Sequence, residues 1–231
     1  WSFMGGSMPT QEVKRKLTAI LSADVKGYSR LMGEDEEATV HMLNAYKGVM
    51  ANFIQRHHGR VVDAPGDNVL AEFASVVDAV RCAVEIQKEL RIRNAELPEN
   101  RKMEFRIGVN LGDVVEEKDK ILGDGVNIAA RMDSLADGGG ICISGTAYDQ
   151  VEGKLGLTCE YLGEQAVKNI AKPVRVYRVL IYSGTPTSTS GIDQHIQFCT
   201  TVDGVRIAYS LVGKGPVLVF PPGWISHLQV Q

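Results

Sequence analysis

Apolar residues recur along the chain with two different spacings, and each spacing predicts a different kind of element. Residues 35–54 and 76–90 carry apolar side chains three or four positions apart, which is the pattern of a helix with one buried face. Residues 124–135 predict a third helix. Short apolar, β-rich runs predict strands at residues 16–24, 60–64, 69–73, 103–110, 113–117, 141–144, 157–162 and 174–181.

The order of these elements predicts the fold class. The first six read strand, helix, strand, strand, helix, strand, and Pro65-Gly66-Asp67-Asn68 between the second and third strands has the composition of a hairpin turn. This order matches the split βαβ arrangement. We therefore predict an α+β fold (an α/β sandwich) with a ferredoxin-like βαββαβ core and extra C-terminal strands.

A change of composition near residue 183 predicts a domain boundary. Residues 183–193 are rich in Ser, Thr, Gly and Pro and are predicted to be a linker between a domain at 14–182 and a short segment at 194–231. Residues 1–8 have neither the charged nor the apolar region of a signal peptide. They are interpreted as an expression scar ahead of a native start near Met8.

Composition excludes several classes of protein. Hydrophobic content of 44% and charged content of 23% are those of a globular domain. A net charge of −3 provides no broad basic surface, so no nucleic-acid partner is expected. The four cysteines are scattered, without a metal-binding or disulfide pattern, and no apolar run is long enough to span a membrane. These observations predict a cytoplasmic protein without a membrane segment.

Two aspartates lie where the predicted strands end. Asp24 closes the first strand and Asp67 occupies the hairpin tip, and a ferredoxin-like sheet would bring the two together. Neighbouring carboxylates repel unless cations lie between them, and hard oxygen ligands suit Mg²⁺ or Mn²⁺. The stretch after Asp24 contains Gly27 and Tyr28 and leads into a helix, whose first backbone amides could hold phosphates.

A third segment adds groups suited to a nucleotide. Asn127 and Arg131 lie four residues apart on the predicted helix 124–135, so they project from one face. Their amide and guanidinium suit a ribose oxygen and a pentavalent phosphate. Each feature alone also fits an ordinary turn or a solvated helix face. Together they point to in-line displacement at phosphorus with two metal ions.

Four ordered sequence blocks carry a family resemblance. They are ILSADVKGYS (20–29), GDNVLAEF (66–73), RIGVNLG (106–112) and VNIAARM (126–132). Over residues 16–182 their order and spacing resemble the class III adenylyl/guanylyl cyclase homology domain. The resemblance implies that two catalytic domains pair head to tail, with each active site lying across the interface of the homodimer.

The resemblance also implies a role for each site residue. Asp24, Asp67 and the carbonyl of Val25 would bind two Mg²⁺ or Mn²⁺ ions in one subunit. Asn127 and Arg131 would reach in from the partner to orient the ribose and stabilise charge on the phosphate. The 3′-hydroxyl of ATP or GTP would attack the α-phosphorus, pyrophosphate would leave, and a monomer would be inert.

The positions that read the purine base depart from the family pattern. Adenylyl cyclases usually carry a lysine and then an aspartate or threonine where this sequence has Asp63 and Lys120. These two side chains could contact the base, or pair with each other and leave it unread, and Lys120 could equally be a solvated loop residue. Lys168 is the better candidate for a triphosphate contact, and Lys172 is the other.

The last residues carry a second, weaker resemblance. Residues 202–209 and 215–224 resemble the first strands of an α/β-hydrolase, but no Gly-x-Ser-x-Gly elbow follows them. We interpret residues 194–231 as the truncated start of a hydrolase-like domain, which cannot catalyse hydrolysis in this chain.

The sequence thus predicts a homodimeric nucleotidyl cyclase, a lyase that produces a cyclic nucleotide for signalling. Adenylyl cyclase is the leading activity and guanylyl cyclase is also considered. A second hypothesis is a catalytically weak cyclase-like module that binds nucleotide or a partner for regulation. A third is a hydrolase regulated by its cyclase-like part. The sequence leaves open the choice between ATP and GTP and the signal that regulates the enzyme.

Overall fold

The computed structural model describes residues 14–117, 120–167, 170 and 172–181, together with the backbone of residues 195–200 and 206–211. The chain divides into two units, Trp1–Ile181 and Tyr182–Gln231. In the first unit the strands are β1 (Lys14–Val25), β2 (Gly59–Asp63), β3 (Val69–Phe73), β4 (Phe105–Glu117), β5 (Lys120–Leu122), β6 (Ile141–Ser144), β7 (Thr158–Gln165) and β8 (Val174–Leu180). Its α-helices are α1 (Tyr28–Glu34), α2 (Glu36–Arg56), α3 (Val76–Ala95), α4 (Asp124–Leu135) and α5 (Gly145–Val151).

The strands form one mixed sheet in the order β2-β3-β1-β4-β6-β8-β7, with β5 paired to β4. The segment β2-β3-β1-β4 is the sheet of the predicted ferredoxin-like core, and β6, β8 and β7 are the extra C-terminal strands. Every neighbouring pair is antiparallel except β4 and β6. The predicted α+β fold class is therefore confirmed.

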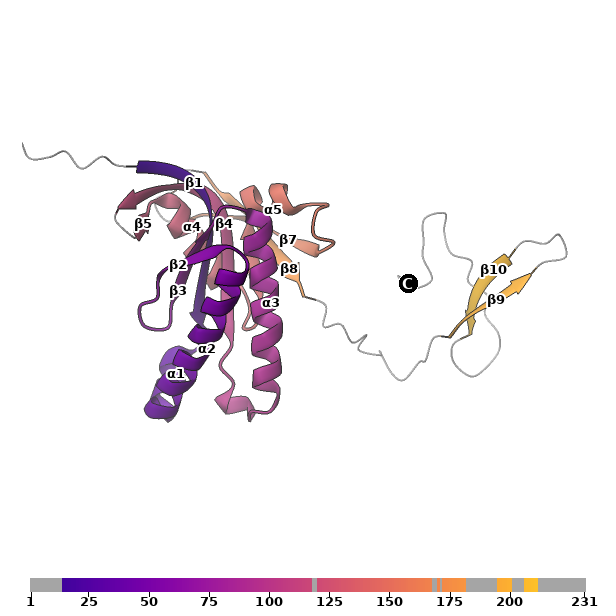
Figure 1. Ribbon diagram of the computed structural model, residues 1–231, viewed down its shortest axis with the longest axis horizontal. Coiled ribbons are helices and arrows are strands. Elements are labelled where there is room, and N and C mark those ends of the chain that lie inside the picture. The colour runs from indigo at the N-terminus through magenta and orange to yellow at the C-terminus, as the bar shows by residue number, and fades with distance from the viewer. Residues whose placement is uncertain are drawn as a thin grey trace, which may run out of the picture. The chain divides into compact units, whose positions relative to one another are not determined.

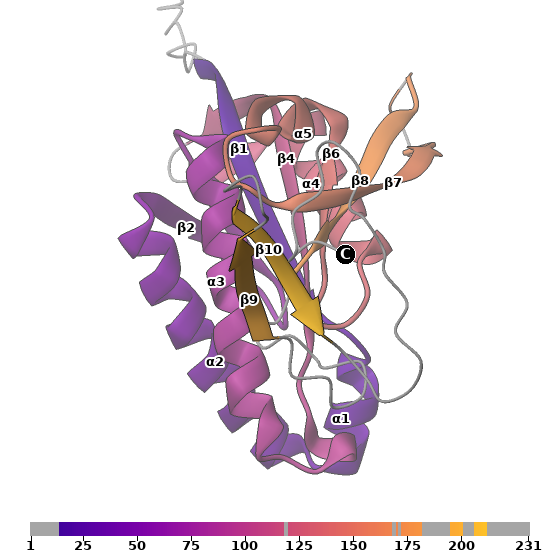
Figure 2. The same cartoon turned by 90° about the vertical axis from the view of Figure 1, so that its right-hand side faces the viewer.

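Helices cover both faces of this sheet (Figures 1 and 2). Along β1, Ala19, Leu21 and Ala23 join the large apolar cluster that includes residues of α2 and α3. Ile20 points the other way and belongs to a smaller cluster with Ala129 of α4. Because side chains alternate along a strand, the even-numbered positions of β1 face α4.

The structure corrects the prediction of two strands at 103–110 and 113–117. Instead β4 is one continuous strand that pairs with β1 from Phe105 to Glu116. Gly112 has a packing role here: a Cβ atom at this position would lie 3.0 Å from the Cα of Gly125, so the missing side chain lets α4 approach the strand. The stretch after Asp24 leads into a helix as predicted, but this helix is the separate short α1, which precedes the predicted helix at 35–54; α5 was not among the predicted elements.

The second unit is described only at two strands. These are β9 (His195–Thr200) and β10 (Arg206–Leu211), which pair antiparallel. The predicted linker at 183–193 lies outside the described residues, as does most of the predicted hydrolase-like segment. The assignment of residues 194–231 therefore stays a prediction from the sequence.

Candidate active site

Asp24 is the penultimate residue of β1 and lies on the face of the sheet that α4 covers. Two residues earlier on the same face, the Ser22 hydroxyl donates a 2.6 Å hydrogen bond to the Asp133 carboxylate of α4. The Asp24 side chain is 22% exposed, so it lies at the margin of this packed layer. The end of a strand thus holds the carboxylate on a rigid element close to solvent.

Asp67 lies in the turn between β2 and β3, at the same end of the sheet. The register pairs Ala23 of β1 with Val69 of β3, so the turn before Val69 lies beside the end of β1. Gly66 adopts the left-handed conformation at φ 53° that this turn requires. Lys47 of α2 donates hydrogen bonds to the carbonyls of Ala64 and Gly66, which fixes the turn against the helix layer.

Arg106 of β4 is the side chain at this site to which the sequence assigned no role. It lies opposite Asp24 in the β1–β4 register, and its guanidinium donates to both carboxylate oxygens, with an Nε–Oδ1 distance of 2.9 Å. The hydrogen bond with Asp24 raises the pKa of Arg106; burial opposes this shift, and the charges of Asp24, Asp133 and Asp67 add to it. Asp67 therefore lies within electrostatic range of the same guanidinium.

Asp133 is a second buried carboxyl group beside this pair. Only 4% of the residue is exposed, and burial raises its pKa to about 7. The Ser22 hydrogen bond and the charge of Arg106 oppose the shift, whereas the charge of Asp24 increases it. The end of β1 thus gathers more carboxylates than cations, which is the electrostatic setting that favours cation binding.

The stretch after Asp24, to which the sequence assigned phosphate binding, forms a turn into α1. Gly27 is the N-cap residue, at φ 70°, and makes no side-chain cap bond. The Lys26 amide is already engaged, because it donates to the Glu104 carbonyl at 2.9 Å. The amides that follow at Gly27 and Tyr28 stand at the helix start, where no intrahelical acceptor exists.

Asn127 and Arg131 lie on α4, but they face away from their own sheet. Gly125, Ala129 and Met132 are buried positions of this helix, and Asn127 and Arg131 are both exposed. Within the described part of the chain, the side chains of these two residues make no hydrogen bond or ion pair. One chain therefore presents the aspartates and the Asn–Arg pair on surfaces that do not face each other.

The two positions expected to read the base lie together. Asp63 ends β2 and Lys120 begins β5, and Lys120 Nζ lies 3.6 Å from Asp63 Oδ2. Their side chains are 43% and 67% exposed, so this is a solvent-facing ion pair. Lys168 falls outside the described residues, and Lys172 is exposed.

The donors at the end of β1 fit hard divalent cations. Asp24 and Asp67 supply carboxylate oxygens and Val25 supplies a backbone carbonyl, which are ligand types that Mg²⁺ and Mn²⁺ prefer. Among the residues that the structure describes, no cluster of three or more His, Cys, Asp or Glu side chains forms a metal site. In the same part of the chain, no helix combines the length and the apolar composition that crossing a membrane requires.

Solved nucleotide cyclases share this fold. The adenylate/guanylate cyclase/hydrolase from Silicibacter pomeroyi is 36% identical with a TM-score of 0.70, over 73% of this chain and 99% of that chain. The adenylyl cyclase CyaB from P. aeruginosa is 26% identical with a TM-score of 0.65, over 74% of this chain and 96% of that chain. The fold is therefore that of the nucleotide cyclases.

Sequence comparison defines the family. The sequence model of the adenylate and guanylate cyclase catalytic domain matches residues 11–181. A putative adenylate cyclase 3 from Rhizobium meliloti (strain 1021) is 44% identical over 171 residues, which are 74% of this chain and 29% of that protein. The chain belongs to the family of adenylate and guanylate cyclase catalytic domains, which are lyases, and spans less than a third of this relative's length.

Proposed function

We propose that this chain is an adenylyl cyclase that forms cyclic AMP and pyrophosphate from ATP in a site shared by two copies. The orientation of α4 carries the proposal. Asp24 lies on the sheet side of α4, whereas Asn127 and Arg131 project from the opposite, exposed side of that helix. A head-to-tail dimer would bring the Asn–Arg pair of one copy to the aspartates of the other.

The aspartate half of the site would hold the metals. Asp24, Asp67 and the Val25 carbonyl would bind two Mg²⁺ or Mn²⁺ ions, and the turn at Gly27 and Tyr28 would hold phosphate oxygens at the start of α1. When bound, the ions would make the 3′-hydroxyl more acidic and neutralise charge on the triphosphate.

The Asn–Arg half would act on the sugar and the reacting phosphate. Asn127 would hold a ribose oxygen so that the 3′-hydroxyl points at the α-phosphorus. The new O3′–P bond forms as the bond to pyrophosphate breaks, and the hydroxyl proton passes to solvent water. Arg131 would stabilise the negative charge that develops on the α-phosphate oxygens. Lys168 would contact the departing phosphates.

The Asp63–Lys120 pair would read the base. Its low energetic value as an exposed ion pair leaves both groups available to a ligand. Adenine offers an amino donor to Asp63 and a ring-nitrogen acceptor to Lys120. GTP is a second candidate substrate, because the edge of guanine offers O6 to Lys120 and two N–H donors to the carboxylate of Asp63.

The direct test is product formation. The purified chain is incubated with ATP or GTP and Mn²⁺, and cyclic nucleotide is measured. We expect cyclic AMP from the wild-type chain and none from Asp24→Ala. Formation of cyclic GMP alone would establish guanylyl cyclase activity instead. A confirmed dimer that forms neither product would refute the enzyme proposal and favour a nucleotide-binding regulatory module.

Complementation tests the shared site. Asp67→Ala removes one half and Arg131→Ala removes the other, so each homodimer should be inactive. In a mixture, heterodimers contain one site in which both halves are intact, and part of the activity should return. A mixture as inactive as its components, with exchange of subunits demonstrated, would show that the site is not shared.

A further inference from the structure

The guanidinium of Arg106 uses both oxygens of Asp24. Asp24 and Arg106 are directly opposed on β1 and β4, and Nε and Nη2 of the arginine each donate to one carboxylate oxygen. Both side chains are largely buried, with 22% of Asp24 and 25% of Arg106 exposed. This two-pronged contact is the strongest geometry that an arginine and a carboxylate can adopt.

Two further carboxylates besides Asp24 lie within electrostatic range of Arg106. Its Nη1 lies 3.5 Å from the Ser134 carbonyl of α4, and the charges of Asp133 and Asp67 act on it together with that of Asp24. One guanidinium therefore supplies positive charge to three acidic side chains at the end of the sheet. A divalent cation bound there would supply the same charge.

We propose that Arg106 is a positioning residue that competes with a divalent cation for the Asp24 carboxylate, so that metal binding requires the guanidinium to leave. The inference rests on the proposed role of Asp24 as a metal ligand. If both oxygens of Asp24 coordinate metal ions, as proposed, the metal ions compete with the Nε and Nη2 donors of Arg106 for the lone pairs of the same two oxygens. Two cations on one partly buried carboxylate also repel each other.

Competition of this kind sets the affinity of the site for metal. The apparent affinity for metal equals the intrinsic affinity multiplied by the fraction of molecules in which Asp24 is released from Arg106. When no metal is bound, Arg106 pairs with Asp24, so that this partly buried carboxylate is not left without a partner. Binding at Asp24 becomes an exchange of one cation for another.

The test measures Mn²⁺ binding to the full chain by electron paramagnetic resonance of the free ion, without nucleotide. Arg106→Gln removes the charge, and Arg106→Lys keeps the charge but loses the fork. We expect Arg106→Gln to tighten the Mn²⁺ dissociation constant about tenfold and Arg106→Lys to tighten it about threefold. Arg175→Gln is the matched control, since Arg175 of β8 pairs with Asp149 at 2.6 Å, and its affinity should equal that of wild type.

Asp24→Asn separates the inference from the proposed function. If this variant binds Mn²⁺ as wild type does, Asp24 is not a ligand and both ideas fail. If binding depends on Asp24 but both Arg106 variants bind as wild type or more weakly, only the competition is refuted. An effect of Arg106→Gln with none of Arg106→Lys would refute it too, because charge alone would then explain the change.

A second measurement uses the wild-type chain, so its result does not depend on whether the Arg106 variants fold. Phenylglyoxal labelling of Arg106 is followed by mass spectrometry in the wild-type chain, with and without Mg²⁺. Release from Asp24 should make labelling at least about threefold faster when Mg²⁺ is added, and Asp24→Asn should be labelled fast without it. Labelling of Arg106 that Mg²⁺ leaves unchanged or slows would overturn the proposal.

Discussion

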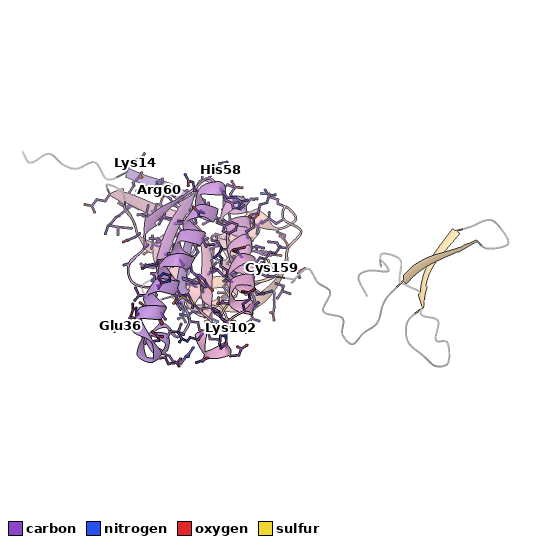
Figure 3. The ribbon with its side chains drawn as sticks, turned by 60° about the horizontal axis from the view of Figure 1, so that its bottom comes forward. Lys14, Glu36, His58, Arg60, Lys102 and Cys159 are labelled. Carbon is purple, nitrogen blue, oxygen red and sulfur yellow. The ribbon has the colours of Figure 1, made fainter. Side chains whose placement is uncertain are left out.

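Strand β1 carries a cluster of charged side chains at each end, and the two clusters differ in their balance. Near its start, Lys14, Lys16 and Arg60 contact two carboxylates, those of Glu72 and Glu116. Figure 3 shows Lys14 and Arg60 at this end of the sheet. Near the other end, Arg106 faces Asp24, with the charges of Asp133 and Asp67 close by.

The cluster near the start of β1, where cations outnumber carboxylates, can be explained by stability alone. Lys16 Nζ lies 3.0 Å from Glu72 and 3.1 Å from Glu116. Burial lowers the pKa of Lys16, but the hydrogen bonds and charges of these two carboxylates outweigh burial and raise it overall. At the other end of β1 the three carboxylates of Asp24, Asp67 and Asp133 outnumber the two cations within electrostatic range of them, Arg106 and Lys47. An excess of carboxylates in a partly buried position destabilises a fold unless a cation from outside joins it, and this difference distinguishes the end of β1 where the site is proposed.

Substitutions at the two ends of β1 should differ most in their effect on the rate of catalysis. Asp24→Asn should lower the rate of cyclic nucleotide formation at least ~100-fold, because it removes a proposed ligand of both metal ions. Glu72→Gln, near the start of β1, should leave the rate unchanged when both variants are assayed well below their unfolding temperatures. Equal losses in the two variants would show that the charge excess does not mark the site.

Glu72→Gln, which should spare activity, is expected to lower the free energy of unfolding. Glu72 is 9% exposed and holds Lys16 and Arg60, so Glu72→Gln leaves two cations short of a partner. Because both cations are partly solvated, we expect a loss of roughly 2 kcal/mol in the free energy of unfolding, measured by urea denaturation. Glu116→Gln is the control and should cost less, since its carboxylate is more exposed. A Glu72→Gln variant as stable as wild type would contradict the structural role of this cluster.

The buried carboxyl group of Asp133 should make the stability of the chain depend on pH. Its pKa is about 7 in the folded chain against an ordinary value of 3.8, so the folded state holds the proton more tightly than the unfolded state. The buried carboxyl group therefore lowers stability progressively from about pH 4 to about pH 7, and no further above that. Asp133→Asn should remove this slope and be more stable than wild type at pH 8 by roughly 4 kcal/mol, since each pKa unit of the shift corresponds to about 1.4 kcal/mol.

Thermal unfolding of both proteins between pH 4 and pH 8 measures the effect. The two stability curves should meet near pH 4 and separate as pH rises. The amide introduced by Asp133→Asn would retain an oxygen that accepts from Ser22, so the 2.6 Å hydrogen bond is not itself under test. Parallel curves would mean that Asp133 does not titrate on unfolding as its burial implies.

The sequence predicts the fold well wherever a residue's role is local. Strand spacing and the hairpin at Gly66-Asp67 predict the core that the sheet order β2-β3-β1-β4 confirms, because period and turn composition are properties of neighbouring residues. The two strands predicted at 103–110 and 113–117 leave out Leu111 and Gly112, whereas β4 continues through Gly112. The role of Gly112, the close approach of α4, depends on a helix that follows it in the chain.

The residues of the candidate site also differ in whether their position follows from local sequence or from the pairing of distant strands. Asp24 was singled out because it closes a predicted strand and Asp67 because it lies at a predicted hairpin tip, and the spacing of Asn127 and Arg131 predicted that they share one helix face. Arg106 was not assigned a role, because an arginine on an alternating strand is usually solvated. Only the register that sets it opposite Asp24 shows the contact. The catalytic roles of all these residues stay predictions until the variants are measured.

The smallest effect on stability is expected at the exposed ion pair of Asp63 and Lys120, which is proposed to read the base. Exposed ion pairs contribute little to folding, so Lys120→Gln should change the free energy of unfolding by less than about 1 kcal/mol. If Lys120 and Asp63 read the base, the same change should alter the ratio of kcat/KM for ATP and GTP. The double exchange Asp63→Lys with Lys120→Asp keeps an ion pair but restores the order of charges usual in adenylyl cyclases, and should favour ATP further. An unchanged ratio in both variants would mean that Asp63 and Lys120 only pair with each other, and that other residues select the nucleotide.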